Sequence, residues 1–318
     1  MAVISGRSKT KYSDRAQQAE PYEAPINVRQ IGNLSYGNGL STDYYEPMAS
    51  TKQEVLPDKS AMHVAVVLHD DPYEGTRYDV APLAMEMARR GMAAFTPSLS
   101  KSDAEPFFLR QLGDLFDLLA DLAADKFGLG LRPQTYAADG NKIVLVGCGT
   151  GAMLATVAMR LYHNARMREY FAAQCPAVRR FFAMGATPTV AFDDLVRIGG
   201  LVSMSGNVHP TSSSAVYDYD RWLGKGFVST KLFDYLDLSR WYAPTYPPVL
   251  LVTAGADVNR QEALSVARAW PSAACRLLDL PREDNDNHLL DTLFWARHPL
   301  WTKSKEVNSQ IVTYCRNL

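Results

Sequence analysis

The sequence predicts an α/β protein built on a doubly wound, mostly parallel sheet with helices on both faces. Three observations support this fold class. Short runs rich in valine and leucine recur along the chain, and amphipathic segments of helical length separate them. A glycine cluster, Gly147-Cys148-Gly149-Thr150-Gly151, joins one apolar run to a helix-like segment. Strands that alternate with helices are joined by helical crossovers and therefore lie parallel in a sheet.

Six apolar runs with polar or turn-forming boundaries fit buried strands. They lie at 63–70, 92–98, 142–147, 199–206, 247–255 and 275–281. Apolar residues three and four apart predict the intervening helices. These helices are expected at 79–91, 106–128, 150–170 and 260–270, with a last one at the C-terminus. Gly91 is expected to end the first of them, because glycine accepts the left-handed conformation found after helices.

The chain is expected to divide at about residue 58. Residues 1–58 are polar and interrupted by prolines, which predicts an arm that is partly disordered and contains a hairpin near 28–46. Residues 59–318 form the predicted domain, and residues 207–247 are an aromatic-rich insertion between its fourth and fifth strands.

Composition excludes several classes of partner. The 318 residues are 47% hydrophobic and 21% charged with a formal net charge of −1, so neither nucleic acid nor a membrane surface is expected as a partner. Four separated cysteines show no metal-ligand spacing and are expected to be free thiols of a cytoplasmic protein. The basic, serine-containing N-terminus fits a disordered tail better than organellar targeting. No cofactor or metal is expected.

Two interpretations of the glycine turn are open. VLVGCGTG at 144–151 resembles the first motif of class I methyltransferases, which bind S-adenosylmethionine. That interpretation requires a following strand that ends in an acidic residue for the ribose hydroxyls. The following segment, ATVAMRLYHNARMREYFAAQ at 155–174, is instead helical and basic.

The second interpretation is a nucleophile elbow, G-x-S-x-G, in which a strand turns sharply into a helix. An acid and a histidine should follow later strands, and LLVTAGADV supplies Asp257 while LPREDNDNHLL supplies His288. The chain from about residue 60 resembles the α/β-hydrolase superfamily. Four stretches resemble its small carboxylesterase and arylformamidase branch: YG at 36–37, DYYEP at 43–47, VSMSG at 202–206 and PPVLLVTAGAD at 247–257.

The resemblance implies a serine at the apex of the elbow, but the apex is Gly149, which has no nucleophilic atom. It also implies a His-Gly-Gly-Gly type loop that offers backbone N–H groups to an oxyanion. The loop here reads His69-Asp70-Asp71-Pro72, and proline has no N–H while the carboxylates repel negative charge. Both departures predict loss of serine-hydrolase turnover.

Other roles for these residues remain open. Cys148 is a relocated nucleophile or a buried small side chain, and Thr150 a nucleophile or a helix N-cap. Water activated by His288 is a further route. The acidic loops around Asp70 and Asp284 are expected to be solvated rather than metal-binding.

The aromatic insertion predicts an acyl or aryl pocket formed by Tyr217, Tyr219 and Trp222, unless these rings only cover the sheet. His69, Asp70, Asp71, Cys148 and Thr150 are expected to line the same site. The leading hypothesis is a pseudo-hydrolase that binds a small molecule, a protein partner or a second copy. The alternatives are a hydrolase with a non-standard nucleophile or activated water, and a methyltransferase. If Asp257 and His288 are aligned, Gly149→Ser is expected to gain labelling by a fluorophosphonate.

Overall fold

An eight-stranded sheet forms the centre of the structure, a computed structural model. The structure describes residues 25–49, 51, 55–56, 58–59, 62–102, 106–131, 142–184, 198–209, 219–240, 242–255, 257, 259–280 and 302–318. The sheet order is β1-β2-β4-β3-β5-β6-β7-β8. The strands are β1 (Val28–Tyr36), β2 (Leu40–Pro47), β3 (Val64–Leu68), β4 (Ala93–Pro97), β5 (Ile143–Cys148), β6 (Ile198–Met204), β7 (Val249–Ala254) and β8 (Cys275–Leu280).

The strands from β4 to β8 are parallel, and β1 and β2 are added antiparallel at one edge. This arrangement confirms the predicted fold class. The hairpin of β1 and β2 occupies 28–47, close to the range in which the sequence indicates one. It belongs to the same sheet as the rest of the chain, because β2 pairs with β4.

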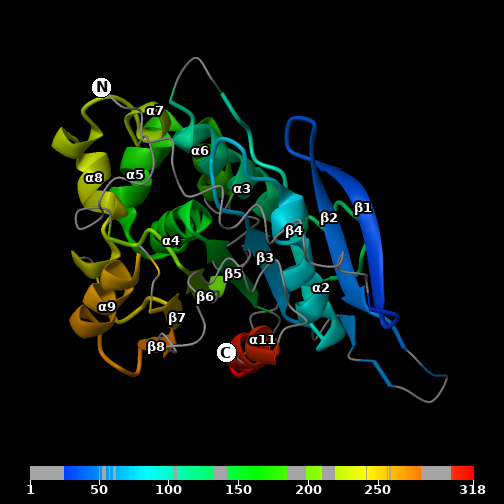
Figure 1. Cartoon of the computed structure of the whole chain (residues 1–318). Helices are drawn as coiled ribbons and strands as arrows, with labels where there is room; N and C mark the ends of the chain where they lie inside the picture. Colours follow the sequence, from blue (N-terminus) through cyan, green and yellow to red (C-terminus); the bar gives the residue numbers. More distant parts are fainter. Residues whose placement is uncertain are drawn as a thin grey trace.

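Helices cover both faces of the sheet (Figure 1). Side chains of α2 (Ala81–Arg89) and α11 (Thr302–Arg316) belong to the apolar core on one face. Those of α3 (Phe108–Ala123), α4 (Thr150–His163) and α9 (Arg260–Ala269) belong to the larger core on the other. The remaining α-helices are α5 (Ala165–Gln174), α6 (Pro176–Met184), α7 (Tyr219–Leu223) and α8 (Lys231–Leu236).

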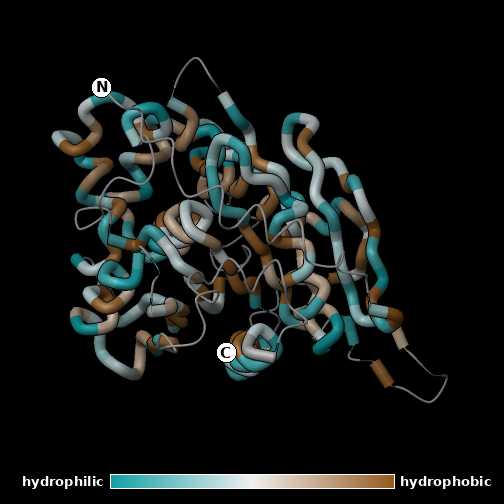
Figure 2. The backbone as a smooth tube through the Cα atoms, in the orientation of Figure 1, coloured by the Kyte–Doolittle hydropathy of each residue, from teal (hydrophilic) through white to brown (hydrophobic). Residues whose placement is uncertain are grey.

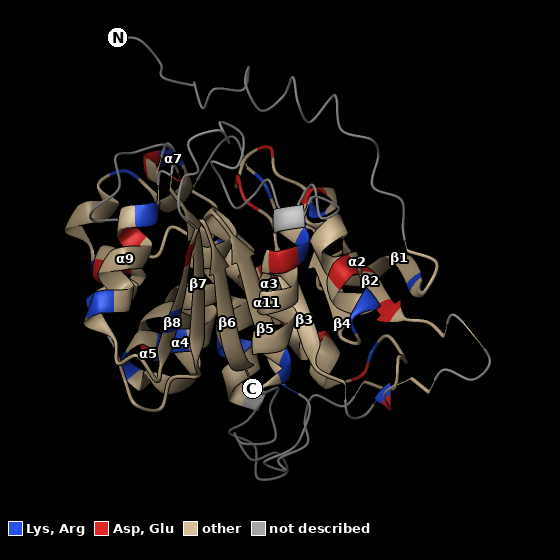
Figure 3. Cartoon of the chain, turned by 60° about the horizontal axis from the view of Figure 1, so that its bottom comes forward, with Lys and Arg blue, Asp and Glu red and all other residues tan. Residues whose placement is uncertain are grey.

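The central strands are apolar on both sides because both sides are covered by helices. Val64 and Val66 of β3 belong to the larger core, whereas Ala65 and Val67 between them belong to the other. Figure 2 shows hydrophobic colouring concentrated in these strands. Charged residues lie mainly on the helices and loops around them (Figure 3). In the part of the chain that is described, no helix has both the length and the apolar character needed to cross a membrane.

One predicted helix is wrong in its extent. The helix expected at 150–170 ends at His163, and α5 begins directly afterwards. Asn164 causes the break, because it adopts an extended backbone and its side chain accepts a hydrogen bond from Met167 N at 2.9 Å. This is the geometry of an N-cap, which starts a new helix.

Candidate functional site

The order of the strands creates a topological switch point between β3 and β5. The chain leaves β3 for β4 on one side and then returns to β5 on the other side of β3. The loops after β3 and β5 therefore run in opposite directions, and such a switch point is where open α/β sheets bind their ligands. Asp70 follows β3 and Gly149 follows β5, so both lie at this point.

The turn after β5 has a backbone conformation that favours glycine. Gly149 has φ +53° and ψ −115°, a region that residues with a Cβ enter only with strain. Its neighbours are restricted by close contacts instead. A Cβ on Gly147 would lie 2.3 Å from Ala152 Cα, and one on Gly151 would lie 2.5 Å from the carbonyl oxygen of His69. The glycine turn therefore packs closely against both the first turn of α4 and the end of β3.

The carboxylate of Asp70 fills the space above Gly149. A Cβ added to Gly149 would lie 1.9 Å from Asp70 Oδ1 and 2.6 Å from Oδ2. Oδ1 accepts hydrogen bonds from Thr150 N at 2.7 Å and from Thr150 Oγ1 at 3.1 Å. Gly149 is the N-cap residue of α4, so the Asp70 carboxylate binds a free N–H at the positive end of that helix. The expectation that Thr150 is itself the N-cap is wrong, because Thr150 is the first helical residue.

The loop that carries Asp70 is held by its own polar groups. Asp71 has φ +59°, and its Oδ1 accepts hydrogen bonds from Tyr73 N at 3.0 Å and Glu74 N at 3.1 Å. Asp71 is thus a turn-forming residue. Gly75 packs closely against Asp70 in this loop. A Cβ at position 75 would lie 1.8 Å from the carbonyl oxygen of Asp70, so a side chain does not fit there. These contacts fix the direction in which Asp70 projects.

A buried ion pair attaches this loop to the hairpin. Arg77 Nε lies 3.2 Å from Asp43 Oδ2, and both side chains are almost fully buried. The guanidinium also donates to Ser41 Oγ, to Ser98 Oγ at 2.9 Å and to Asn33 Oδ1 at 2.6 Å. A buried charge of this kind is stabilising only when its hydrogen bonds are satisfied, as they are here. The loop after β3 is therefore fixed at both ends.

His69 stands at the base of the loop and is buried. Its Nδ1 lies 2.9 Å from the carbonyl oxygen of Asp70. Burial lowers the pKa of the imidazole, so the ring is neutral near pH 7. Its Nε2 has no hydrogen-bond partner among the described residues. Cys148 points away from this loop into the apolar core that contains α2 and α11.

Asp257 lies just beyond β7 and is largely buried. Its Oδ2 accepts a hydrogen bond from Thr253 Oγ1 at 2.8 Å, and its Oδ1 accepts one from Asn259 N at 2.9 Å. The Asn259 side chain in turn donates to Ser205 O at 2.6 Å. Asp257 is therefore fixed at the same end of the sheet as Gly149 and Asp70. His288 and Tyr217 lie outside the described residues, as do Asp284 and Asp286.

Trp222 belongs to the aromatic core beside α3. Its Nε1 donates to Gln111 Oε1 at 2.9 Å, and its ring meets Phe108 edge to face. Gln111 Nε2 contacts the carbonyl oxygens of Pro72 and Ser100, which connects the insertion to the Asp70 loop. Trp222 and Phe108 also line a cavity of about 170 Å³. The described residues that line it are Pro106 and residues of α3, α5 and the segment from α7 to α8, and they include neither Gly149 nor Asp70.

Sequence reasoning missed several polar residues of this region. Arg77, Gln111, Asn207 and Glu262 are all buried. Each lies in a stretch whose sequence is typical of a polar loop or an exposed helix face. The hydrophobic periodicity therefore does not indicate that its side chain is buried. No group of three or more histidine, cysteine or acidic residues in the described part of the chain has the arrangement needed to hold a metal ion.

Comparisons with known proteins identify the class of fold. No protein-family model matches the sequence, and no curated protein matches it. Among solved structures, an inhibited esterase B from Lactobacillus rhamnosis has a TM-score of 0.72 at 16% identity and covers 96% of this chain and 92% of its own. A bacterial heroin esterase has a TM-score of 0.62 at 15% identity, over 97% of this chain and 90% of its own.

Esterase LipW from Mycobacterium marinum has a TM-score of 0.62 at 15% identity and covers 97% of this chain and 86% of its own. The fold of this chain is thus of the α/β-hydrolase type, and its structural neighbours are esterases. The methyltransferase interpretation is not favoured. The strand after the glycine turn, β6, also ends at Met204 and is followed by Ser205 rather than by an acidic residue.

Proposed function

We propose that this chain is a pseudo-hydrolase: an α/β-hydrolase-fold protein that has lost serine-hydrolase turnover and uses the site at the switch point to bind a small molecule. One observation carries the proposal. The position at which the esterase resemblance requires a nucleophilic serine is Gly149, and the carboxylate of Asp70 takes up the space of its side chain.

Both nucleophilic attack and stabilisation of the oxyanion are affected. An acyl-enzyme needs an attacking oxygen or sulfur atom, and glycine has neither. The N–H of the residue after the nucleophile is the donor expected to stabilise the oxyanion, and here Thr150 N already donates to Asp70 at 2.7 Å. Losing one such donor costs about 3 kcal/mol of transition-state stabilisation. A carboxylate in its place adds electrostatic repulsion.

A retained acid supports descent of the site from a working hydrolase. Asp257 follows β7, where the resemblance places the acid of the triad, and it is held by Thr253 and Asn259. With the nucleophile absent, Asp257 is proposed to serve as a polar anchor for a ligand. The proposed ligand is a small molecule, held by residues that lie at the carboxyl ends of β3, β5 and β7.

One observation favours a second candidate function, a hydrolase with a non-standard nucleophile. The Asp70 carboxylate itself lies where an elbow side chain would project, and carboxylates are nucleophiles in several enzyme classes. Alkylation by an epoxide reagent separates the two candidates. A single adduct on Asp70, absent from Asp70→Asn, would support the second candidate, whereas an unmodified Asp70 supports the first.

The main proposal is tested with a fluorophosphonate probe on the full chain. The expected result is no covalent labelling, read by intact mass, at probe concentrations that label a serine esterase completely. Labelling of any single residue would overturn the proposal. Ligand binding is then sought by thermal shift with a panel of small esters, amides and carboxylic acids, and a saturable shift that Asp257→Asn weakens would locate the ligand at this site.

A further inference from the structure

A short segment after β6, Ser205–His209, forms one wall of the site and is called the wall segment here. On one side it touches the glycine turn, because Asn207 N donates to Gly149 O at 3.1 Å. On the other side it is attached to α9, because His209 N donates to Glu262 Oε2 at 3.0 Å. Glu262 thus contacts the wall segment directly.

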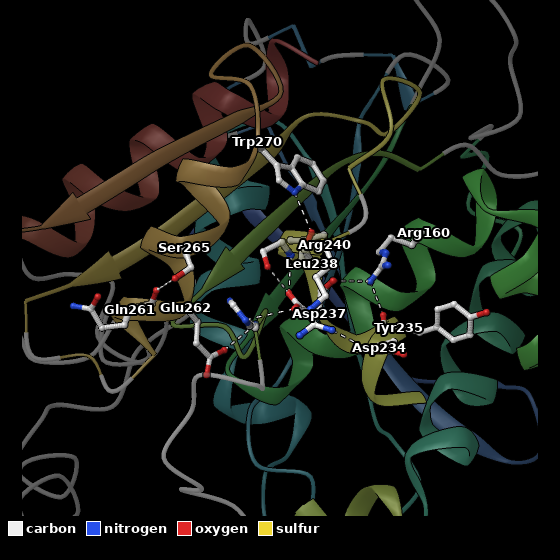
Figure 4. Close-up of polar contacts among 12 residues, drawn as sticks. Arg160, Asp234, Tyr235, Asp237, Leu238, Arg240, Gln261, Glu262, Ser265 and Trp270 are labelled. Atoms are coloured by element: carbon white, nitrogen blue, oxygen red, sulfur yellow. Dashed lines mark hydrogen bonds and ion pairs between the residues drawn. The ribbon is translucent and has the colours of Figure 1, made fainter. Parts of the chain in front are cut away.

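The surroundings of Glu262 are strongly acidic for a buried position. Glu262 is 1% exposed, and its Oε1 has no hydrogen-bond partner in the described part of the chain. Asp257 after β7 and Asp237 after α8 both act on its charge. Asp237 also contacts Arg240 Nε at 2.8 Å and His209 Nε2 at 3.5 Å (Figure 4).

The arginine and histidine side chains near Glu262 face other carboxylates. Arg240 and the His209 ring face the Asp237 carboxylate, while Arg260, on the same helix as Glu262, pairs with Asp279 of β8 at 2.7 Å. Among the described residues, the groups that stabilise the charge of Glu262 are the backbone N–H groups of His209 and Val208. Burial, with the nearby Asp257 and Asp237 carboxylates, raises the pKa of Glu262 to about 7, against the opposing effect of the His209 and Val208 N–H groups.

We propose that Glu262 is a proton-dependent latch for the site: its neutral carboxyl holds the wall segment against α9, and its ionisation releases the segment. The neutral carboxyl still accepts the His209 N–H, and its burial costs little. The ionised carboxylate is repelled by Asp237 and Asp257 and gains hydration by turning outward, which breaks the contact with His209. The inference goes beyond the proposed function, because the movement needs neither a ligand nor a reaction.

The sign of the pH dependence follows from proton binding. The released carboxyl has a pKa near its ordinary value of 4.5, whereas the latched one titrates at about 7. Between these values the latched state holds a proton that the released state lacks. The released fraction therefore rises with pH, by up to about tenfold per pH unit, and levels off above pH 7.

Amide hydrogen exchange at His209 tests the latch. After correction for the intrinsic rise of exchange with pH, protection of this amide is expected to fall by up to about tenfold per unit from pH 5 to 7. Glu262→Gln should remove the slope, because its amide stays neutral. Asp114→Asn is a matched control that removes another buried carboxyl, on α3, and should keep the wild-type slope.

His209→Asn separates the latch from titration of the imidazole. The slope, read there at residue 209 and at the amide of Val208, should persist in this variant. A flat wild-type profile, or an equal slope in Glu262→Gln, would overturn the inference. If Glu262→Gln does not fold, the wild-type and His209→Asn profiles still decide it. None of these outcomes bears on fluorophosphonate labelling, so failure of the latch and failure of the proposed function are distinguishable.

Discussion

Asp70 Oδ1 and Thr150 N lie 2.7 Å apart although 80 positions separate the two residues in the chain. The contact joins the loop after β3 to the first turn of α4. It satisfies a helix N–H that the glycine N-cap, with no side chain, leaves free. The same carboxylate denies position 149 a side chain. One acidic residue therefore stabilises the helix and occupies the space of a side chain at position 149.

Restoring a nucleophile requires two changes. Gly149→Ser alone is expected to stay unlabelled by a fluorophosphonate, because the serine Cβ would lie 1.9 Å from Asp70 Oδ1. This replaces the expectation from sequence that the single change is enough. Asp70→Gly combined with Gly149→Ser frees both the space and the Thr150 N–H and should gain labelling. Asp71→Gly with Gly149→Ser is the matched control, and labelling equal to that of the Asp70 double variant would contradict this assignment.

The buried pair of Arg77 and Asp43 should be costly to break. Arg77→Met leaves the Asp43 carboxylate uncompensated, and the expected loss is about 3–5 kcal/mol in the free energy of unfolding, measured by urea denaturation. Arg77→Lys should recover only part of it, since an ammonium group cannot reach Ser98 and Asn33 together. In the double variant with Asp43→Asn the two losses should not add. Full additivity would show that the pair is not coupled.

Stability should fall with rising pH through two buried carboxyls. Burial raises the pKa of Asp114 to about 6, against the opposing Ser100 N–H. Between its ordinary value and 6 the folded chain holds a proton that the unfolded chain lacks, so this stability is present at low pH and is lost as pH rises. Each such group contributes a slope of at most about 1.4 kcal/mol per pH unit.

Urea unfolding from pH 4.5 to 7.5 measures this dependence. Asp114→Asn should flatten the part of the curve below pH 6, and Glu262→Gln the part that extends to about 7. A wild-type stability that rises across this range, with both variants parallel to it, would show that neither carboxyl is protonated in the folded chain.

Most of the sheet is predictable because its strands are contiguous and apolar. β3, β4 and β7 lie inside the runs from which they are expected, and the glycine turn lies where β5 meets α4. The break at Asn164 is less visible, because it depends on a single capping side chain within a continuous amphipathic pattern. Pattern alone cannot distinguish such a cap from a polar residue on the helix surface.

The site is less predictable than the fold, since its contacts join distant parts of the chain. The sequence indicates that Asp70 disfavours an oxyanion, but its placement on Thr150 depends on β3 and β5 being neighbours. Glu262 lies in a polar stretch of α9 that reads as a solvent-facing surface, yet it is buried. Such residues become visible only when the packing of α9 against the wall segment is known.

The Asp70 carboxylate and a side chain at position 149 would occupy the same space, and this has a consequence for how the sequence can vary. Aspartate at 70 and a side chain at 149 exclude each other, so mutation at either position is tolerated only in a background that suits the other. If position 149 is changed alone, the new side chain clashes with Asp70, and if Asp70 is shortened alone, the space above Gly149 is left underpacked. Homologues are therefore expected to show co-variation, with glycine at 149 accompanying aspartate at 70.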